Sequence, residues 1–260
     1  MKFKQALLAV IAMATPIAAN AVTVVNGDFQ SGYTSNTEFG ASYPGGAGPT
    51  GWAATGYALY FDGSNASTQN AAGQYASSGV EKLWAKLPSS ASNGLTTNAI
   101  FGASGNHFVA LDGDATAGVA ASIWQTIGGL TVNDTYEVSF NWAAAQLQSR
   151  TGATTETLQV TFGGSTQTTS VLSNQSQGFV DGGLAKLSFI ASSASQVLTF
   201  LSVGSPVGLP PIALLDNITV TDKTVHASVP EPSTWAIMLT GFGALAFFAR
   251  RRRGGFSDIA

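Results

Sequence analysis

The chain has 260 residues, a formal net charge of −3 and no cysteine, which excludes disulfides, thiolate metal sites and cysteine nucleophiles. Between residues 22 and 228, five Lys or Arg stand against twelve Asp or Glu, so this middle part is near −7. Such a body has no basic surface for nucleic acid.

The N-terminus has the pattern of a secretory signal peptide. Lys2 and Lys4 precede an apolar stretch at 6–17, and small residues follow at Ala19 and Ala21. Cleavage after Ala21 would leave a mature chain that begins at Val22. The alternative is a transmembrane anchor, but about a dozen apolar residues fall short of the roughly 20 that a span needs. We therefore expect a signal peptide helix at 1–21.

Residues 22–222 are expected to form one all-β body. Tyr136, Val138, Phe140 and Trp142 share one phase of an alternating pattern, which is typical of a half-buried strand. Similar short stretches are separated by Gly- and Asn-rich turns, such as Gly182-Gly183, and this spacing favours a jelly-roll β-sandwich. The other expected strands are Val22–Val25, Tyr57–Phe61, His107–Leu111, Ala121–Ile127, Leu158–Phe162, Ala185–Phe189, Gln196–Val203 and Ile212–Thr221. Trp124 and Trp142 are expected in its core.

The stretch 31–105 is harder to interpret, and we expect two or three irregular strands and long loops there. Its aromatic residues suggest carbohydrate binding, because a sugar ring stacks on an aromatic face. The candidate residues are Trp52, Tyr57, Tyr60 and Trp84. The alternative is that these large aromatics belong to the core.

Asp216 breaks the pattern of its strand, because it shares the inward phase of Leu214 and Ile218. A buried carboxylate is costly unless it is hydrogen-bonded, paired or bound to a metal. Asn26, Asp28 and Asp216 could therefore hold a structural calcium ion between the first and last strands. The alternative is a β-bulge, or a carboxylate that caps a turn. No other cofactor is expected.

Further carboxylates raise two more hypotheses. Asp112-Gly113-Asp114 resembles the start of a calcium loop, but no ligands follow at the fifth and twelfth positions, so a strand-ending turn is preferred. Asp112, Asp114, Glu137 and Glu156 could supply a glycosidase pair, although sequence cannot place any two together.

The histidines argue against catalysis. His107 and His226 are the only two in the chain, and His226 lies just before the C-terminal segment. A Ser-His-Asp triad would therefore need His107, yet no Gly-X-Ser-X-Gly motif accompanies it. We expect a protein that is not an enzyme.

The C-terminal segment begins after a linker at 223–229. Pro230-Glu231-Pro232 and Trp235 precede an apolar run to Ala249, and Arg250, Arg251, Arg252 and Arg253 follow. The run from Trp235 has 15 residues, or roughly 22 Å of helix at about 1.5 Å per residue, so we expect a short transmembrane helix. The arginines should stay on the cytoplasmic side, with 255–260 as a tail. The alternative is an ordinary single-pass anchor.

The order of these parts resembles the PEP-CTERM sorting signal, at residues 230–254. The resemblance implies export by the secretion machinery of a Gram-negative bacterium and recognition of Pro230, Glu231 and Pro232 by the membrane protease exosortase. The protein would be held briefly at the inner membrane and then reach the cell envelope or the extracellular space.

The body also resembles a group of PEP-CTERM proteins that have galactose-binding-like jelly-roll domains akin to carbohydrate-binding modules. Five segments carry this likeness: Asn26–Phe29, Phe108–Asp114, Trp124–Ile127, Tyr136–Trp142 and Gly208–Asn217. It implies a non-catalytic structural or adhesive protein in an exopolysaccharide environment. The alternative function is a carbohydrate-binding module or a carbohydrate-active enzyme, with polysaccharide as its partner.

Overall fold

A computed structural model describes residues 22–40, 46–64, 66, 82–84, 94–114, 120–148, 150–224 and 232–253. The expected signal peptide at 1–21 and the residues 225–231 lie outside this set. The chain divides into a compact body, Asn20–Thr224, and a second unit that contains the C-terminal residues Val225–Ala260. Each is described separately.

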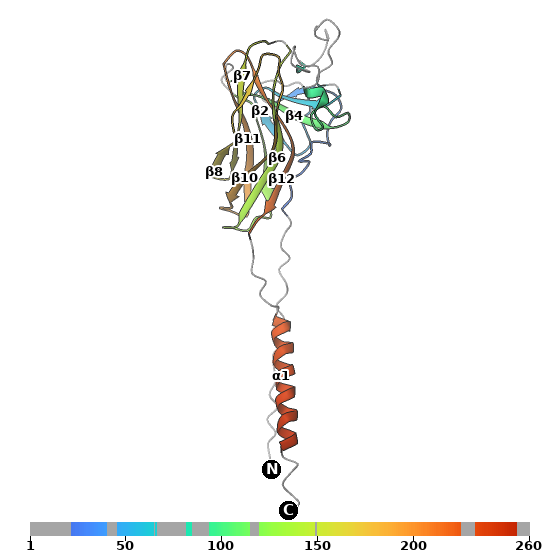
Figure 1. Cartoon of the computed structure of the whole chain (residues 1–260), viewed down its shortest axis with the longest axis vertical. Helices are drawn as coiled ribbons and strands as arrows, with labels where there is room; N and C mark the ends of the chain where they lie inside the picture. Colours follow the sequence, from blue (N-terminus) through green and yellow to red (C-terminus); the bar gives the residue numbers. More distant parts are fainter. Residues whose placement is uncertain are drawn as a thin grey trace, which may run out of the picture. The chain divides into compact units, whose positions relative to one another are not determined.

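The body is built from twelve strands in its described part, and they all pair antiparallel (Figure 1). In chain order they are β1 (Thr37–Phe39), β2 (Ala53–Thr55), β3 (Ala58–Asp62), β4 (His107–Asp112), β5 (Ser122–Gly128), β6 (Thr135–Gln146), β7 (Thr154–Phe162), β8 (Ser165–Thr168), β9 (Leu172–Asn174), β10 (Val180–Ile190), β11 (Ser195–Ser205) and β12 (Pro211–Asp222). A 3-10 turn, η1 (Leu95–Thr97), lies between β3 and β4 in the sequence.

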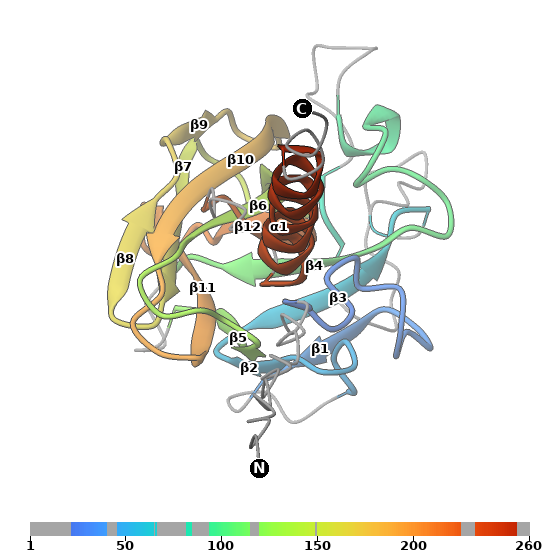
Figure 2. The same ribbon diagram turned by 90° about the horizontal axis from the view of Figure 1, so that it is seen from below.

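The strands form two sheets, which confirms the predicted all-β sandwich (Figure 2). Sheet A has the order β1-β3-β4-β12-β6-β10, and sheet B has the order β2-β5-β11-β7-β8, with β9 also paired to β7. The strands β1, β2 and β3 confirm the expectation of short strands after residue 31. One predicted strand is wrong: residues 22–25 form no strand, and the Val25 amide donates instead to the Gln125 side chain at 2.8 Å.

The main core lies between the sheets. Tyr136, Val138, Phe140 and Trp142 of β6 all point into it, as the alternating pattern predicts. Phe140 meets Phe200 of β11 edge-on, with ring centroids 5.0 Å apart. The periodicity of β6 therefore identifies its buried face correctly.

The prediction for Trp124 is wrong, because this side chain is only partly buried, on the outer face of sheet B. Its neighbours Ile123, Gln125 and Ile127 are buried on the inward phase of β5. Gln125 also points inward, because its side-chain amide hydrogen-bonds to the backbone: its Nε2 donates to the carbonyls of Val25 and Gly51, both at 2.9 Å.

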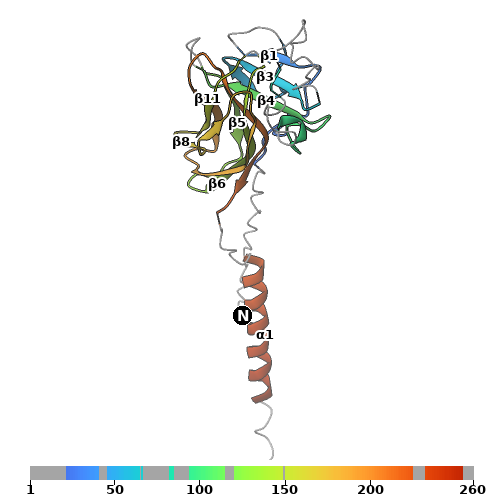
Figure 3. The same ribbon diagram turned by 45° about the horizontal axis from the view of Figure 1, so that its top comes forward.

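A second core covers the outer face of sheet A. Leu59 and Phe61 of β3 are fully buried in it, whereas their neighbour Tyr60 points into the main core. The segment after residue 94, green in Figure 3, lies beside β4 and contributes Leu95 and Phe101 to this second core. Strands β3 and β4 are therefore buried on both faces.

The C-terminal unit contains one described helix, α1 (Pro232–Arg253). Proline suits the first position of a helix, because the N–H it lacks would have no partner there. A helix is thus confirmed where one was expected. Its predicted membrane crossing is not supported, because no helix in the described residues is long and apolar enough to span a membrane. The apolar run is short, and the four arginines end it.

Candidate functional site

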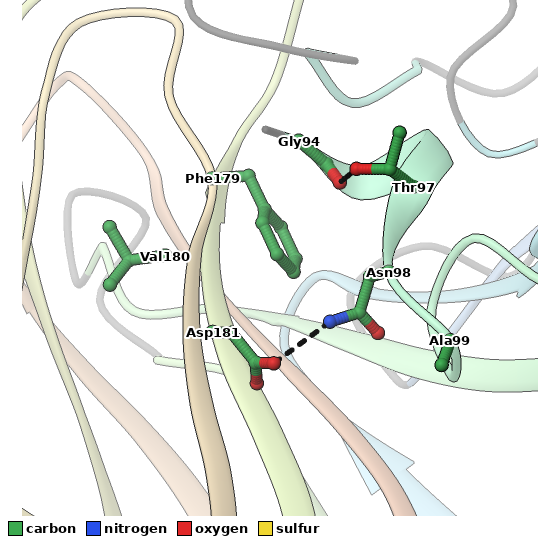
Figure 4. A pocket seen from close by; sticks show the side chains of 7 residues that line it. All are labelled: Gly94, Thr97, Asn98, Ala99, Phe179, Val180 and Asp181. Carbon is green, nitrogen blue, oxygen red and sulfur yellow. Dashed lines mark hydrogen bonds between the residues drawn. The ribbon is translucent and has the colours of Figure 1, made fainter. Parts of the chain in front are cut away.

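A pocket of about 500 Å³ opens where β10 begins, beside η1. Figure 4 shows its two sides: Asp181 lies at the start of β10 with Phe179 just before the strand, and Thr97 and Asn98 come from the turn opposite. The described residues that line it are Gly94, Thr97, Asn98, Ala99, Phe179, Val180 and Asp181.

A β-bulge sets the direction of Asp181. The pairing of β10 with β6 shifts register between Asp181 and Gly183, so Gly182 is an extra residue. A Cβ on Gly182 would lie 2.5 Å from the indole nitrogen of Trp142, and Gly183 has a φ of 67°. Both positions therefore require glycine. Bulges re-aim side chains in this way beside binding sites.

Hydrogen bonds fix the Asp181 carboxylate in place. Its Oδ1 accepts from the Gly183 amide at 2.8 Å, and its Oδ2 accepts from Nδ2 of Asn98 at 3.0 Å. Asn98 is itself held, because its Oδ1 accepts from the amides of Ile100 and Phe101, each at 2.9 Å. The pocket thus presents a pre-positioned carboxylate and amide.

The Phe179 ring supplies the apolar part of the pocket. It packs against the second core and meets Phe101 edge-on, with centroids 6.5 Å apart. An aromatic ring next to a fixed carboxylate and an amide is the set of groups that binds a sugar, with the ring against C–H groups and the polar atoms against hydroxyls. Sequence reasoning missed this site, because Gly182-Gly183 resembles a turn and Asn98 is distant in sequence.

Two of the four predicted sugar-binding aromatics belong to the core instead. Trp52 is only 8% exposed, and its indole N–H donates to the carbonyls of Val25 and Asn26, each at 3.1 Å. Tyr60 is fully buried, and its hydroxyl donates to the carbonyl of Phe29. Neither ring has a face free for a ligand, so the alternative of core placement holds for both.

Tyr57 and Trp84 are partly exposed and are not among the described residues that line the pocket. The Tyr57 hydroxyl donates to Oε1 of Glu38 at 2.9 Å. The Trp84 indole donates to the carbonyl of Arg150 at 2.8 Å. Both anchor their own loops.

Asp216 is fully buried, as predicted, but the predicted inward phase is wrong. It shares the phase of Leu214 in the second core, on the outer face of sheet A, whereas Ile218 beyond the register shift lies in the main core. Burial raises the pKa of its carboxyl to about 7, against the hydrogen bonds from Asn106 and Asn217 that lower it, and the charge of Asp28 raises it further. Nδ2 of Asn106 donates to Asp216 at 2.8 Å, and the amide of Asn217 donates at 2.7 Å. The register of β12 shifts between Asp216 and Thr219, so the β-bulge alternative holds.

The other two proposed calcium ligands, Asp28 and Asn26, differ in whether their side chains are already engaged elsewhere. Asp28 is exposed, yet it is close enough to raise the pKa of Asp216. The Asn26 side chain links two loops instead: its Nδ2 donates to the carbonyls of Ser31 and Thr50, and its Oδ1 accepts from the Ser31 amide at 2.8 Å. The described residues contain no group of three or more acidic, His or Cys side chains that could hold a metal. A cation here would rest on Asp28, Asp216 and neutral oxygens.

His107 does not form a catalytic triad with the residues around it. Its Nε2 lies 3.4 Å from Asp62, and its ring stacks on Tyr33 with centroids 4.1 Å apart. The Ser64 hydroxyl donates to the same Asp62 carboxylate rather than to the imidazole. Asp62 therefore stands between the serine and the histidine, whereas a nucleophile needs the base beside it.

Of the acidic candidates for glycoside hydrolysis, Asp112 and Glu156 lie close enough for the charge of Asp112 to raise the pKa of Glu156, whereas Glu137 is paired with lysines. Glu137 lies 3.7 Å from Lys186 and 3.1 Å from Lys223. Glu156 is fully buried between the sheets, and burial raises its pKa to about 8. The turn at Asp112 ends β4 as expected, because its Oδ1 accepts from the Asp114 amide at 2.7 Å.

Residues 228–253 match the family model of the PEP-CTERM protein-sorting motif. The chain carries a PEP-CTERM signal. This motif implies an exported protein that exosortase processes at the membrane. Pro230 and Glu231 of the motif lie outside the described residues. Pro232 begins α1, Trp235 is exposed on it, and the arginines from Arg250 close it.

Solved carbohydrate-binding modules are similar to this PEP-CTERM chain at low identity. A CBM4 structure shares 13% identity and covers 45% of this chain and 71% of its own, with a TM-score of 0.27. The CBM22-1 xylan-binding domain of Xyn10C from Paenibacillus barcinonensis shares 11% identity and covers 74% of this chain and 94% of its own, with a TM-score of 0.33.

The CBM22-1 and GH10 modules of a Clostridium thermocellum endo-1,4-beta-D-xylanase are a third similar structure. They share 14% identity and cover 48% of this chain and 24% of their own, with a TM-score of 0.28. No curated protein matches the chain.

Proposed function

We propose that this protein is a non-catalytic component of the cell surface or extracellular matrix, which adheres to polysaccharide after export. The PEP-CTERM motif supports the export step. The observation that carries the adhesive role is the pocket at the start of β10, where a bulge aims Asp181 beside the Phe179 ring.

In this proposal a sugar ring lies against Phe179, and its hydroxyls donate to Asp181. Each carboxylate oxygen has a lone pair left after the bonds from Gly183 and Asn98. Because Asn98 and Gly183 already hold the carboxylate, little side-chain freedom is lost on binding. A pocket of about 500 Å³ fits one or two sugar rings.

We also propose the expected division of the chain. Residues 1–21 are the signal peptide, 22–222 the adhesive body, 223–229 a linker, 230–254 the sorting signal and 255–260 a cytoplasmic tail. Mass spectrometry of the mature protein from its native host tests this division. A chain that begins at Val22 and ends near Pro230 supports it, and a chain that retains both Met1 and Ala260 contradicts it.

A structural calcium ion remains part of the proposal. Asp28 and Asp216 would hold it with neighbouring neutral oxygens, and it would compensate the buried charge of Asp216 by a favourable electrostatic interaction. Without a cation, burial raises the pKa of Asp216 to about 7, so calcium would have to displace a proton from this carboxyl near neutral pH. The chemistry is structural and involves no reaction step.

A glycan array with the purified protein tests the adhesive function. Binding of at least one glycan is expected, with at least a tenfold loss of affinity in Phe179→Ala and in Asp181→Asn. Tyr57→Phe is the matched control, because it removes one hydroxyl outside the pocket and should bind like the wild type. Equal binding by all four proteins would exclude the pocket, and release of shortened sugars would contradict the non-catalytic role.

A further inference from the structure

The described strands of sheet B place no charged side chain on its outer face. Among the residues of β2, β5, β7, β8, β9 and β11, the only charged residue is Glu156, which is fully buried and points inward. The absence extends to the connections in the sequence: residues 115–133, 157–180 and 187–215 contain no Asp, Glu, Lys or Arg. In contrast, the outer face of sheet A carries Lys186 and Glu137.

The side chains on this face form regular rows across the strands. One row runs in register over five strands, and its members are Ala53, Trp124, Thr199, Thr161 and Thr166. The next row consists of Thr55, Ser122, Leu201, Gln159 and Thr168. Val197 and Val203 flank these rows on β11 and are 43% and 44% exposed.

These rows combine hydroxyl groups with the apolar side chains of Ala53, Trp124 and Leu201, and Ser122 is the one member that is buried. Neighbouring strands lie about 4.8 Å apart, so each row presents polar and apolar groups at short, regular intervals. The Thr161 and Thr166 hydroxyls lie 2.9 Å apart and hold one another in place. Trp124, partly exposed near one end of its row, is the largest ring on the face.

The lack of charge restricts the kind of partner. Docking on this face buries no ionic group, so it avoids the large desolvation cost of a charge. The body itself is near −7 between residues 22 and 228, which disfavours a second copy and any acidic polymer through repulsion. An uncharged polysaccharide has the matching chemistry, with C–H faces for Trp124 and the valines and hydroxyls for the threonines.

We propose that the outer face of sheet B is a second binding surface, which lies flat against packed chains of an uncharged polysaccharide. It goes beyond the pocket proposal, because the pocket lies on sheet A and would take one or two sugar rings. The row geometry suits a repeating, extended surface, whereas the pocket suits a single chain or chain end.

Co-sedimentation of the full protein with insoluble cellulose and with insoluble chitin tests the second surface. The protein should pellet with at least one of them, and Thr199→Lys should lower the bound fraction at least tenfold. Thr221→Lys on β12 of sheet A is the matched control and should bind within twofold of the wild type. Binding should change less than twofold between about 0.05 and 1 M NaCl, because no ion pairs form.

The controls separate this surface from the pocket and from misfolding. Asp181→Asn should pellet like the wild type even if it loses soluble glycans. If Thr199→Lys does not fold in circular dichroism, Thr126→Lys, at an exposed position of β5, takes its place. The proposal is overturned if neither polysaccharide pellets the protein, if the lysine variants pellet normally, or if they instead abolish a dimer in ultracentrifugation.

Discussion

The buried carboxyl of Glu156 makes the stability of the body depend on pH. Its Oε1 accepts from the Ser202 hydroxyl at 2.9 Å and from the Thr157 amide at 3.2 Å, and these bonds lower its pKa less than burial raises it. Burial raises its pKa from 4.5 to about 8, and nearby Asp112 adds to the increase. That difference corresponds to about 5 kcal/mol of folding free energy.

The direction of the effect follows from proton binding. Below pH 4.5 the carboxyl is protonated in both states, so Glu156 imposes no ionisation penalty. Between pH 4.5 and about 8 the unfolded chain loses a proton that the folded chain keeps, so the free energy of unfolding falls as pH rises. Above pH 8 the penalty is constant.

Glu156→Gln removes this dependence, because glutamine has nearly the same shape and no proton to lose. Relative to the wild type, the variant should gain about 5 kcal/mol between pH 4.5 and 9, as measured by urea denaturation of the purified protein at several pH values. Glu137→Gln is the control, because its carboxylate lies beside Lys186 and Lys223 and should show no such gain. A Glu156→Gln difference that is constant from pH 4.5 to 9 would refute the reasoning.

Three other predictions follow from the geometry. If calcium is bound, a chelator should lower the melting temperature by about 5 °C or more. In the calcium-free protein, the free energy of unfolding should fall as pH rises from 3.8 towards 7, because the folded chain keeps the Asp216 proton that the unfolded chain loses. An unchanged melting temperature with chelator, or an equal response in Asp216→Asn, would contradict the calcium site. Gly182→Ala should cost about 1–3 kcal/mol in urea denaturation, because its methyl group meets Trp142, and a cost near zero would argue against the bulge. Phe179→Ala and Asp181→Asn together should abolish glycan binding measured by calorimetry, while circular dichroism shows an unchanged fold.

Several parts of the fold could be predicted because local pattern and tertiary packing agree. The alternation in β6 identifies Tyr136 and Trp142 as inward. In β12 the alternation predicts that Asp216 is buried but not on which face, because the bulge after it reverses the phase of the strand. In β5 the same reasoning fails for Trp124, because Gln125 takes the buried position to satisfy the backbone of Val25 and Gly51. Apolarity alone therefore selects the wrong face there.

The candidate site was less predictable, because its parts are distant in sequence. Asn98 and Asp181 meet only after sheet A has formed and the segment after residue 94 has packed on it. Trp52 and Tyr60 lie in the irregular stretch after residue 31, yet their polar atoms bind backbone carbonyls inside the body. The sequence shows which residue types that stretch contains, but not which contacts hold it against the body.

The position of β12 sets how the body would respond to a pulling force at its C-terminal end. This last strand lies in the middle of sheet A, between β4 and β6, rather than at an edge. Tension on the chain beyond Asp222 acts along β12, which is paired by backbone hydrogen bonds with β6 up to Asp222 and with β4 over Ile212–Leu215. These bonds run perpendicular to the strand, so they resist by shearing as a group instead of opening one after another. If the proposed sorting leaves the body attached through this end, the central place of β12 would help it to withstand drag.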